Sequence, residues 1–306
     1  MRLLTFAIAL VLSTSACGGG QSVASGARTG ADPSLPPPQR NLIPTVKIAP
    51  ATGWPADTAP TPAAGLKVTR FAIGLQHPRW LHVLPNGDVL VAESNAPPGK
   101  SGIKGIKGAV MGAVMKRAGA GVPSADRITL LRDVDGDGIA EISQPFLTGL
   151  HSPFGMALIG DTLYVANADA LVAVPYRTGD TRITVQPRLV VALPGKGDEL
   201  NHHWTKSLLA SADGRRLYVG VGSNSNVGEN GIAVEANRAN ILEVDPVAGT
   251  MRVFASGLRN PVGLGFAPGS GALWAVVNER DELGNDLVPD YLTEVREGAF
   301  YGWPYS

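Results

Sequence analysis

Two adjacent histidines make the segment NHHWTKSL, residues 201–208, the first place to look for chemistry. The chain has five histidines in 306 residues, and His202 and His203 stand side by side in front of an apolar segment. Imidazole has an unperturbed pKa of about 6.5, which suits proton transfer near neutral pH. The pair is therefore a candidate source of a general base, and the elements around it must position it.

A repeated strand–turn–strand unit indicates where this pair lies. Three copies occupy residues 74–93, 149–167 and 257–279. Each begins with Gly-Leu-x-x-Pro, continues as an apolar strand, turns at a glycine and ends in a second strand. A fourth copy runs from Asn201 to Ser223, with the histidines in the place of the x-x-Pro residues. Such units are typical of a propeller with four-stranded blades, so the sequence predicts an all-β fold with about four blades.

The start of the innermost strand is the shared position of the polar residues. In a propeller these strands line the central channel, so residues at their starts converge on one end of the axis. The residues at this position are His77, His151, His202 or His203, and Arg259 with Asn260. We predict that together they form a site, although His77 and His151, taken singly, are better explained as caps of their own turns. Neighbours in an extended segment point to opposite sides, so only one of His202 and His203 is expected to face the channel.

Composition narrows the class of protein. The 38 glycines and 24 prolines imply frequent turns and favour short strands over long helices. The 26 basic and 26 acidic residues balance, which removes the positive footprint of a nucleic-acid binder, and we expect no nucleic-acid partner. The single cysteine, Cys17, allows no internal disulfide and no cysteine-rich metal site.

The N-terminal segment has the features of an export signal. Its apolar run, Leu3–Leu12, is too short to span a bilayer as a helix. The pattern TSACG around Cys17 resembles a bacterial lipobox, in which cleavage leaves this cysteine as a lipid-bearing first residue; the alternative is an ordinary signal peptide with a chance cysteine. We predict a lipoprotein signal peptide over 1–17, a flexible Gly/Ser/Pro linker over 18–42 and a partial propeller over 43–306.

A lipid anchor implies a location. The protein is expected to be an exported bacterial lipoprotein on the periplasmic or cell-surface side of a membrane, attached to that membrane only by its lipid. Gly18 is not the aspartate associated with retention at the inner membrane, which favours the outer membrane.

The segment DVDGDG, residues 133–138, is a candidate calcium loop. It places carboxylates at Asp133, Asp135 and Asp137, and Glu141 follows. Alternating oxygen ligands in a tight loop suit a hard cation such as calcium. The twelfth position is not a glutamate, and Asp-Gly is also a strong hairpin signal, so a plain turn between strands is the competing interpretation.

The insertion over 102–121 is expected to form a helix. Ile103, Ile106, Val110 and Val114 have helical spacing, with lysines off that stripe. Such a stripe can contact a membrane or a redox partner, but more often it packs on its own domain, and the glycines disfavour a free helix. We predict the packed arrangement.

The segment GSNSNVGENG, residues 222–231, follows the unit that carries the histidines. Its Asn224 is a candidate ligand-binding amide, because a glycine-rich loop at this place can close over a ligand. Amide-rich turns also form for backbone reasons alone, so the loop is expected to support a site rather than to do its chemistry.

Several longer segments resemble one known family. They are NHHWTKSL, LYVGVGSNSN, GLRNPVG, NERDELGNDLVPDYLTEV and YGWPYS. Together they are similar to the sorbosone dehydrogenase branch of the soluble quinoprotein sugar dehydrogenases, which include the glucose dehydrogenases. The resemblance covers the chain from about residue 43 to its end. It implies a six-bladed β-propeller that binds pyrroloquinoline quinone (PQQ) and a calcium ion and oxidises a sugar or sugar aldehyde in the bacterial periplasm.

The resemblance also implies roles for single residues. The general base of the family falls on His203, and its Arg-Asn pair falls on Arg259 and Asn260, where the guanidinium is expected to hold the quinone oxygen and stabilise the charge that builds on it. His151 and Asn224 are further candidates for cofactor binding. The calcium-ligating carbonyls fall on a stretch beginning Asn278-Glu279, where this chain lacks the Gly-Pro of the glucose enzymes, so these two residues are expected to supply oxygen directly.

The family continues for more than a hundred residues past YGWPYS, whereas this chain ends there with four readable units. The resemblance therefore predicts the N-terminal part of a longer propeller, or a protein that has lost its cofactor site. Two alternatives remain open: a calcium-dependent lactonase-type propeller, and a non-catalytic binding module. The metal ligands in the lactonase alternative would be Asn201, Asn260, Asn278 and Glu279. A dehydrogenase also requires an electron acceptor, which the motifs do not identify.

Overall fold

The computed structural model describes residues 34–38, 49–55, 58–98, 105–195, 199, 201–284 and 286–305. The predicted signal peptide over 1–17, with the lipidation site at Cys17, lies outside these residues, and so does most of the predicted linker over 18–42.

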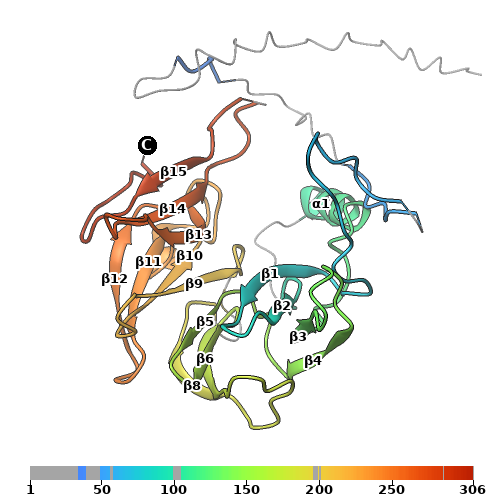
Figure 1. Cartoon of the computed structure of the whole chain (residues 1–306). Helices are drawn as coiled ribbons and strands as arrows, with labels where there is room; N and C mark the ends of the chain where they lie inside the picture. Colours follow the sequence, from blue (N-terminus) through green and yellow to red (C-terminus); the bar gives the residue numbers. More distant parts are fainter. Residues whose placement is uncertain are drawn as a thin grey trace, which may run out of the picture.

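Four antiparallel sheets follow one another along the chain (Figure 1). The first contains β1 (Pro78–Val83), β2 (Val89–Glu93), β3 (Arg127–Arg132) and β4 (Ile142–Thr148). The second contains β5 (Met156–Ile159), β6 (Thr162–Ala166), β7 (Ala170–Pro175) and β8 (Arg188–Ala192). The third contains β9 (Lys206–Ala210), β10 (Leu217–Val221), β11 (Asn240–Asp245) and β12 (Thr250–Ser256). The fourth contains β13 (Asn260–Phe266), β14 (Leu273–Asn278) and β15 (Tyr291–Glu294).

Each sheet is a meander in which consecutive strands pair, and the sheets follow an arc around a common axis (Figure 1). The first strands of neighbouring sheets lie against one another, because β1 contacts β5, β5 contacts β9 and β9 contacts β13. These first strands are therefore the innermost ones. The prediction of an all-β propeller with about four blades is confirmed.

The core lies between the sheets in three clusters, one at each junction. Strand β6 shows how the sequence builds them: Leu163 and Val165 face the first sheet, and Tyr164 and Ala166 face the third. Successive side chains of a strand point to opposite faces, so a sheet with neighbours on both sides needs a continuous apolar run. The apolar segments between the glycine turns are such runs.

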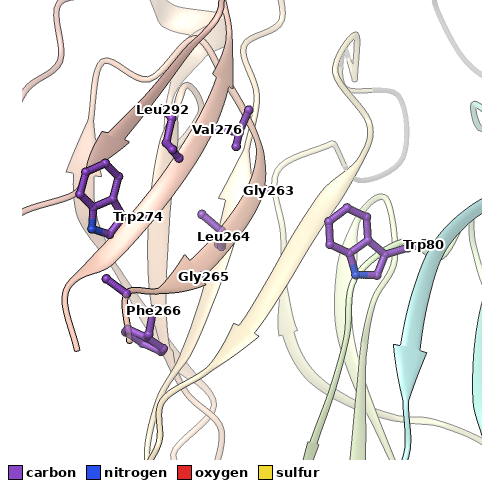
Figure 2. Close-up of a pocket in the computed structure, with 9 residues that line it drawn as sticks. Trp80, Gly263, Leu264, Gly265, Phe266, Trp274, Val276 and Leu292 are labelled. Atoms are coloured by element: carbon purple, nitrogen blue, oxygen red, sulfur yellow. The ribbon is translucent and has the colours of Figure 1, made fainter. Parts of the chain in front are cut away.

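The two terminal sheets keep apolar side chains on the surface. Leu81 and Val83 of β1 are 62% and 65% exposed, and Leu292 of β15 is 63% exposed. Between them, Trp80 faces the fourth sheet across an apolar cavity of about 330 Å³ (Figure 2).

The predicted helix is present as α1 (Gly105–Arg117), but the expectation that it packs against the domain is wrong for its described side chains. Val110 is 59% exposed and Met115 is 47% exposed, while Val114 is only partly covered. Alanines and glycines fill much of the helix, so the contrast between its apolar and polar faces is weak. No helix within the described part of the chain is long and apolar enough to cross a membrane.

Candidate functional site

One cavity at the axis is lined by all four sheets. It encloses about 360 Å³, and four of its lining residues occupy the same position of the repeat, namely Arg79, Phe154, Thr205 and Val262. In three copies this position directly follows the proline of Gly-Leu-x-x-Pro. Pro78, Trp80 and Asn278 complete the lining. We call this the axial cavity.

These four residues were not predicted from the sequence, although the start of the inner strands was predicted to lie at the axis. The prediction used the polar x-x residues and not the residue after the proline. Aligning the repeats by that proline identifies the position, because equivalent residues of a propeller lie at equivalent distances from its axis. The alignment also shows that Arg79 is the one charged residue among the four.

His202 and His203 lie together, contrary to the prediction that they point to opposite sides. Their ring centroids are 4.8 Å apart in an edge-to-face arrangement. The chain bends at both residues before β9 begins, so the alternation of an extended strand does not apply. His202 is exposed and His203 is partly buried.

The hydrogen bonds of His203 define its tautomer. Its Nδ1 lies 2.7 Å from the backbone carbonyl oxygen of Ser223, which can only accept, so Nδ1 carries the proton and donates it. Burial, followed by the positive surroundings of His202 and Arg259, lowers the pKa of His203 to about 3. His203 is therefore neutral at physiological pH, with an unprotonated Nε2 that can accept a proton.

Asn260 lies beside His203. A Cβ added at Gly222 would be 2.5 Å from Cβ of His203 and would also meet Oδ1 of Asn260, so only glycine allows both side chains to approach here. Oδ1 of Asn260 is buried and has no hydrogen-bond partner among the described residues. A buried acceptor of this kind is expected to have a partner, such as water or a ligand. Through Asn278, its partner in β14, Asn260 adjoins the axial cavity.

Arg259 is buried, and its five N–H donors are all used by the protein. Nε donates to the carbonyl of Asn226 at 3.1 Å, and Nη2 donates to Oδ1 of the same residue at 2.9 Å and to the carboxylate of Asp281 at 3.2 Å. Nη1 donates to the carbonyls of Asn278 and Glu279. The guanidinium thus ties two loops together and, in this arrangement, presents no free donor to a quinone oxygen.

Two buried basic side chains, Lys206 and Arg238, hold the histidine segment through hydrogen bonds. Nζ of Lys206 donates to Oδ1 of Asn201 at 3.2 Å and to the carbonyl of Trp204 at 3.0 Å. Nη2 of Arg238 donates to the same Oδ1 at 3.0 Å and to the carbonyl of His203 at 3.1 Å. Burial lowers the pKa of Lys206 well below its usual value and that of Arg238 to about 10. No motif in the sequence pointed to Arg238, which lies far from the repeat position.

Two other candidates, His77 and His151, contact residues of their own sheets. Nδ1 of His77 donates to the carbonyl of Ser94 at 3.0 Å, as a cap within the first sheet does. Among the described residues, no hydrogen bond or ion pair joins His77 or His151 to the His203 region. Nδ1 of His151 pairs with the Asp169 carboxylate at 3.0 Å, which leaves Nε2 for a ligand.

The amide of Asn224 is turned toward protein groups. Its Oδ1 accepts from the backbone N–H of His202 at 3.2 Å, and its Nδ2 donates to the carbonyl of Val234 at 2.8 Å. The backbone N–H of Asn224 in turn donates to the buried carboxylate of Glu235 at 2.8 Å. Asn224 therefore holds the histidine segment in place rather than reaching the cavity.

Asn278 and Glu279 offer side-chain oxygen but not free carbonyls, because Arg259 already donates to both backbone oxygens. The side-chain amide of Asn278 donates to Asp290 at 2.8 Å. Burial raises the pKa of Glu279, and nearby Asp290 raises it further. A cation at this place would favour the ionised carboxylates.

The acidic loop is separate from the axial cavity. Asp133, Asp135, Asp137 and Glu141 each place one carboxylate oxygen within 4.8 Å of the others, in the connection between the outer strands β3 and β4. The same carboxylates accept backbone hydrogen bonds within the loop, such as that from Gly136 to Asp133 at 2.7 Å. The loop has both the ligands of a cation site and the bonds of a stable turn.

Comparison with known proteins gives a family and a fold. A family model described as TrAA12-like matches residues 126–294, more than half of the chain. An uncharacterized protein of Borreliella burgdorferi is 24% identical over 165 residues, which are 51% of this chain and 42% of that protein.

Three solved structures share the fold. The holo form of the pyranose dehydrogenase PQQ domain from Coprinopsis cinerea is 17% identical with a TM-score of 0.55, covering 89% of this chain and 59% of that one. The calcium structure of the Trichoderma reesei family AA12 enzyme is 23% identical with a TM-score of 0.57, covering 80% and 60%. The PQQ-bound aldose sugar dehydrogenase from Streptomyces coelicolor is 20% identical with a TM-score of 0.51, covering 78% and 66%. This chain thus spans less than two thirds of the length of each.

Proposed function

Because this chain belongs to the TrAA12-like family, we propose that it is a PQQ-dependent dehydrogenase that oxidises a sugar or a sugar aldehyde beside the axial cavity. The observation that carries the proposal is the state of His203. Its proton is committed to the Ser223 carbonyl, its imidazole is neutral, and its Nε2 is an unprotonated base. A base in this form is what removal of a hydroxyl proton requires.

The residues around the cavity fit a planar anionic cofactor. Trp80 and Phe154 supply aromatic walls, Arg79 supplies a positive charge, and Oδ1 of Asn260 is a buried acceptor without a partner. When bound, the quinone supplies the acceptor for the hydride that leaves the substrate carbon. His203 takes the hydroxyl proton at Nε2, and its Nδ1–H bond to Ser223 fixes the ring during that transfer.

Arg259 has a different role from the one that the resemblance implies. It holds the loop of Asn226 against the end of β14, and it keeps a positive charge near His203 that lowers the pKa of this histidine. An anionic ligand in the cavity would offset this charge and raise the pKa of His203 toward the pH at which a general base is most effective.

Calcium would be held by side chains. The carbonyls of Asn278 and Glu279 accept from Arg259, so they do not fit a cation in this arrangement. The carboxylate of Glu279, whose pKa is raised by burial, fits better. An ion there would add positive charge beside the cavity and favour a negatively charged ligand.

One contact argues against the lactonase alternative. A divalent cation at the axis would use Asn201 as a ligand, but Oδ1 of Asn201 already accepts hydrogen bonds from Lys206 and Arg238. An amide oxygen whose two lone pairs already accept hydrogen bonds, one of them from a guanidinium, is a poor ligand for a divalent cation. The dehydrogenase is therefore preferred, and within it we propose a sorbosone-like aldose aldehyde as substrate. We also propose a position in the cell envelope.

Turnover of purified protein tests the proposal. PQQ, calcium chloride and a panel of aldoses are added, and reduction of an artificial dye is followed. We expect His203→Ala to lower kcat by about 10²- to 10⁴-fold, the usual contribution of a general base, with PQQ binding nearly unchanged. The matched control is His77→Asn, because His77 caps its own sheet and asparagine tolerates its φ of 55°. Full turnover by His203→Ala would refute the assignment of the base.

A further inference from the structure

Arg79 differs from the residues that share its position in the repeat. Phe154, Thr205 and Val262 line the axial cavity with neutral side chains, and Arg79 is the one charged residue among the described residues of that lining. Equivalent positions of a propeller meet at its axis. The guanidinium of Arg79 therefore places one positive charge where a ligand would contact all four sheets.

A β-bulge directs Arg79 into the cavity. Pro78 pairs with Glu93 and Trp80 pairs with Ala92, so Arg79 is the extra residue of β1. A bulge re-aims the side chain at its position. As a result Arg79 and Trp80, although neighbours, both reach Phe154: the Trp80 ring centroid lies 5.1 Å from that of Phe154, and Cζ of Arg79 lies 5.9 Å from it.

Two aromatic rings hold the guanidinium in place. Besides Phe154, Cζ of Arg79 lies over the ring of Trp204 at 5.5 Å from its centroid. A cation over ring faces is attracted by their negative quadrupoles without using its N–H donors. No described residue accepts a hydrogen bond from Arg79, so its five donors remain for another partner.

No carboxylate of the described residues pairs with Arg79. Two other arginines of the first sheet, Arg127 and Arg132, are each paired with a buried carboxylate, those of Glu93 and Asp88. The side chain of Arg79, by contrast, is exposed. The protein around it still removes part of its water, and this desolvation lowers its pKa. The guanidinium is thus accessible and has no counter-ion among the described residues.

We propose that Arg79 binds a carboxylate of the ligand that occupies the axial cavity. A guanidinium held over two aromatic rings can offer a carboxylate two parallel N–H donors. The carboxylate can belong to the quinone cofactor or to a sugar acid. The identity of the cavity as the ligand site rests on the proposed function.

Binding measurements distinguish the two sources. Calorimetric titrations with PQQ, its neutral trimethyl ester, glucuronate and glucose are made with the full chain in calcium chloride, using the wild type and Arg79→Met. We expect Arg79→Met to raise the Kd of PQQ or of glucuronate by about 10- to 100-fold, as loss of a charged hydrogen-bonding pair does. The Kd values of the ester and of glucose should not change.

Two further variants serve as controls. Arg79→Lys keeps the charge but loses the paired donors, and should fall between the wild type and Arg79→Met. Arg188→Met removes an exposed arginine on the outer strand β8 and should behave as the wild type. A loss confined to PQQ assigns the carboxylate to the cofactor, and a loss confined to glucuronate assigns it to the substrate.

Failure of this inference can be separated from failure of the proposed function. If Arg79→Met binds both acids as tightly as the wild type, the inference is wrong even when the enzyme turns over. A wild-type protein that binds neither acid also overturns it. If the wild type shows no turnover but loses affinity for either acid with Arg79→Met, the dehydrogenase proposal fails and the anion site stands.

Discussion

The partly buried, neutral state of His203 predicts a specific loss of stability in mild acid. In the folded protein its pKa is lowered to about 3, first by burial and then by the charges of His202 and Arg259. In the unfolded chain it returns to about 6.5. The unfolded chain therefore takes up this proton as the pH falls below about 6.5, whereas the folded protein takes it up only near pH 3. The free energy of unfolding must decrease across this interval.

The expected size follows from the two pKa values. Each pH unit between them costs about 1.4 kcal/mol, so one such histidine removes about 2 kcal/mol of the free energy of unfolding between pH 7.5 and pH 5. Asp88 and Glu93, whose carboxyl pKa values are lowered mainly by their arginine partners against the effect of burial, also lose stability in acid. They do so below about pH 4.5, where their unfolded carboxylates take up protons, so their losses fall below the interval used for His203.

Urea denaturation of the wild type and of His203→Gln, at steps from pH 7.5 to 5, measures this contribution. The wild-type free energy of unfolding should fall by about 2 kcal/mol more than that of the variant. His202→Gln is a useful comparison. Desolvation lowers the pKa of His202 as well, but its side chain is more exposed than that of His203. Curves for the wild type and His203→Gln that run parallel over the whole interval would refute the buried neutral state.

Two further outcomes follow from the structure. Gly222→Ala adds a methyl group 2.5 Å from Cβ of His203 and in contact with Oδ1 of Asn260. This variant should lower kcat at least tenfold and leave the circular dichroism spectrum unchanged. A wild-type kcat would mean that the side chains of His203 and Asn260 need not approach each other. Asp135→Ala should lower the melting temperature only when calcium is present if the acidic loop binds an ion, and equal shifts with and without calcium would reduce the loop to a turn.

The sheets could be predicted because each inner sheet buries both faces. That condition imposes continuous apolar runs such as the one in β6, and the glycine turn after each run marks the repeat. The pattern is local in the chain, so a single sequence contains it. The same local pattern placed the polar residues before the inner strands at the axis.

The details of the site depend on features that this pattern does not contain. His202 and His203 lie together because the chain bends there, and alternation applies only to extended segments. Arg79 reaches the cavity through a bulge, which one strand alone does not reveal. The donors of Arg259 are used by Asn226 and by residues at and just after the end of β14, partners that depend on how two sheets pack. Contacts between distant segments determine all three.

The five hydrogen bonds of Arg259 make the candidate site a junction between two repeats. Asn226 belongs to the loop of the third sheet, and the other acceptors are the last residue of β14, Asn278, and two residues that follow it in the fourth sheet, Glu279 and Asp281. In an array of repeats each unit is stabilised by its neighbours, so docking of the fourth sheet has its own equilibrium. Ligand binding at this junction and docking of that sheet are then linked: a ligand stabilises the docked array by mass action. Conversely, any undocked fraction weakens the apparent affinity in proportion.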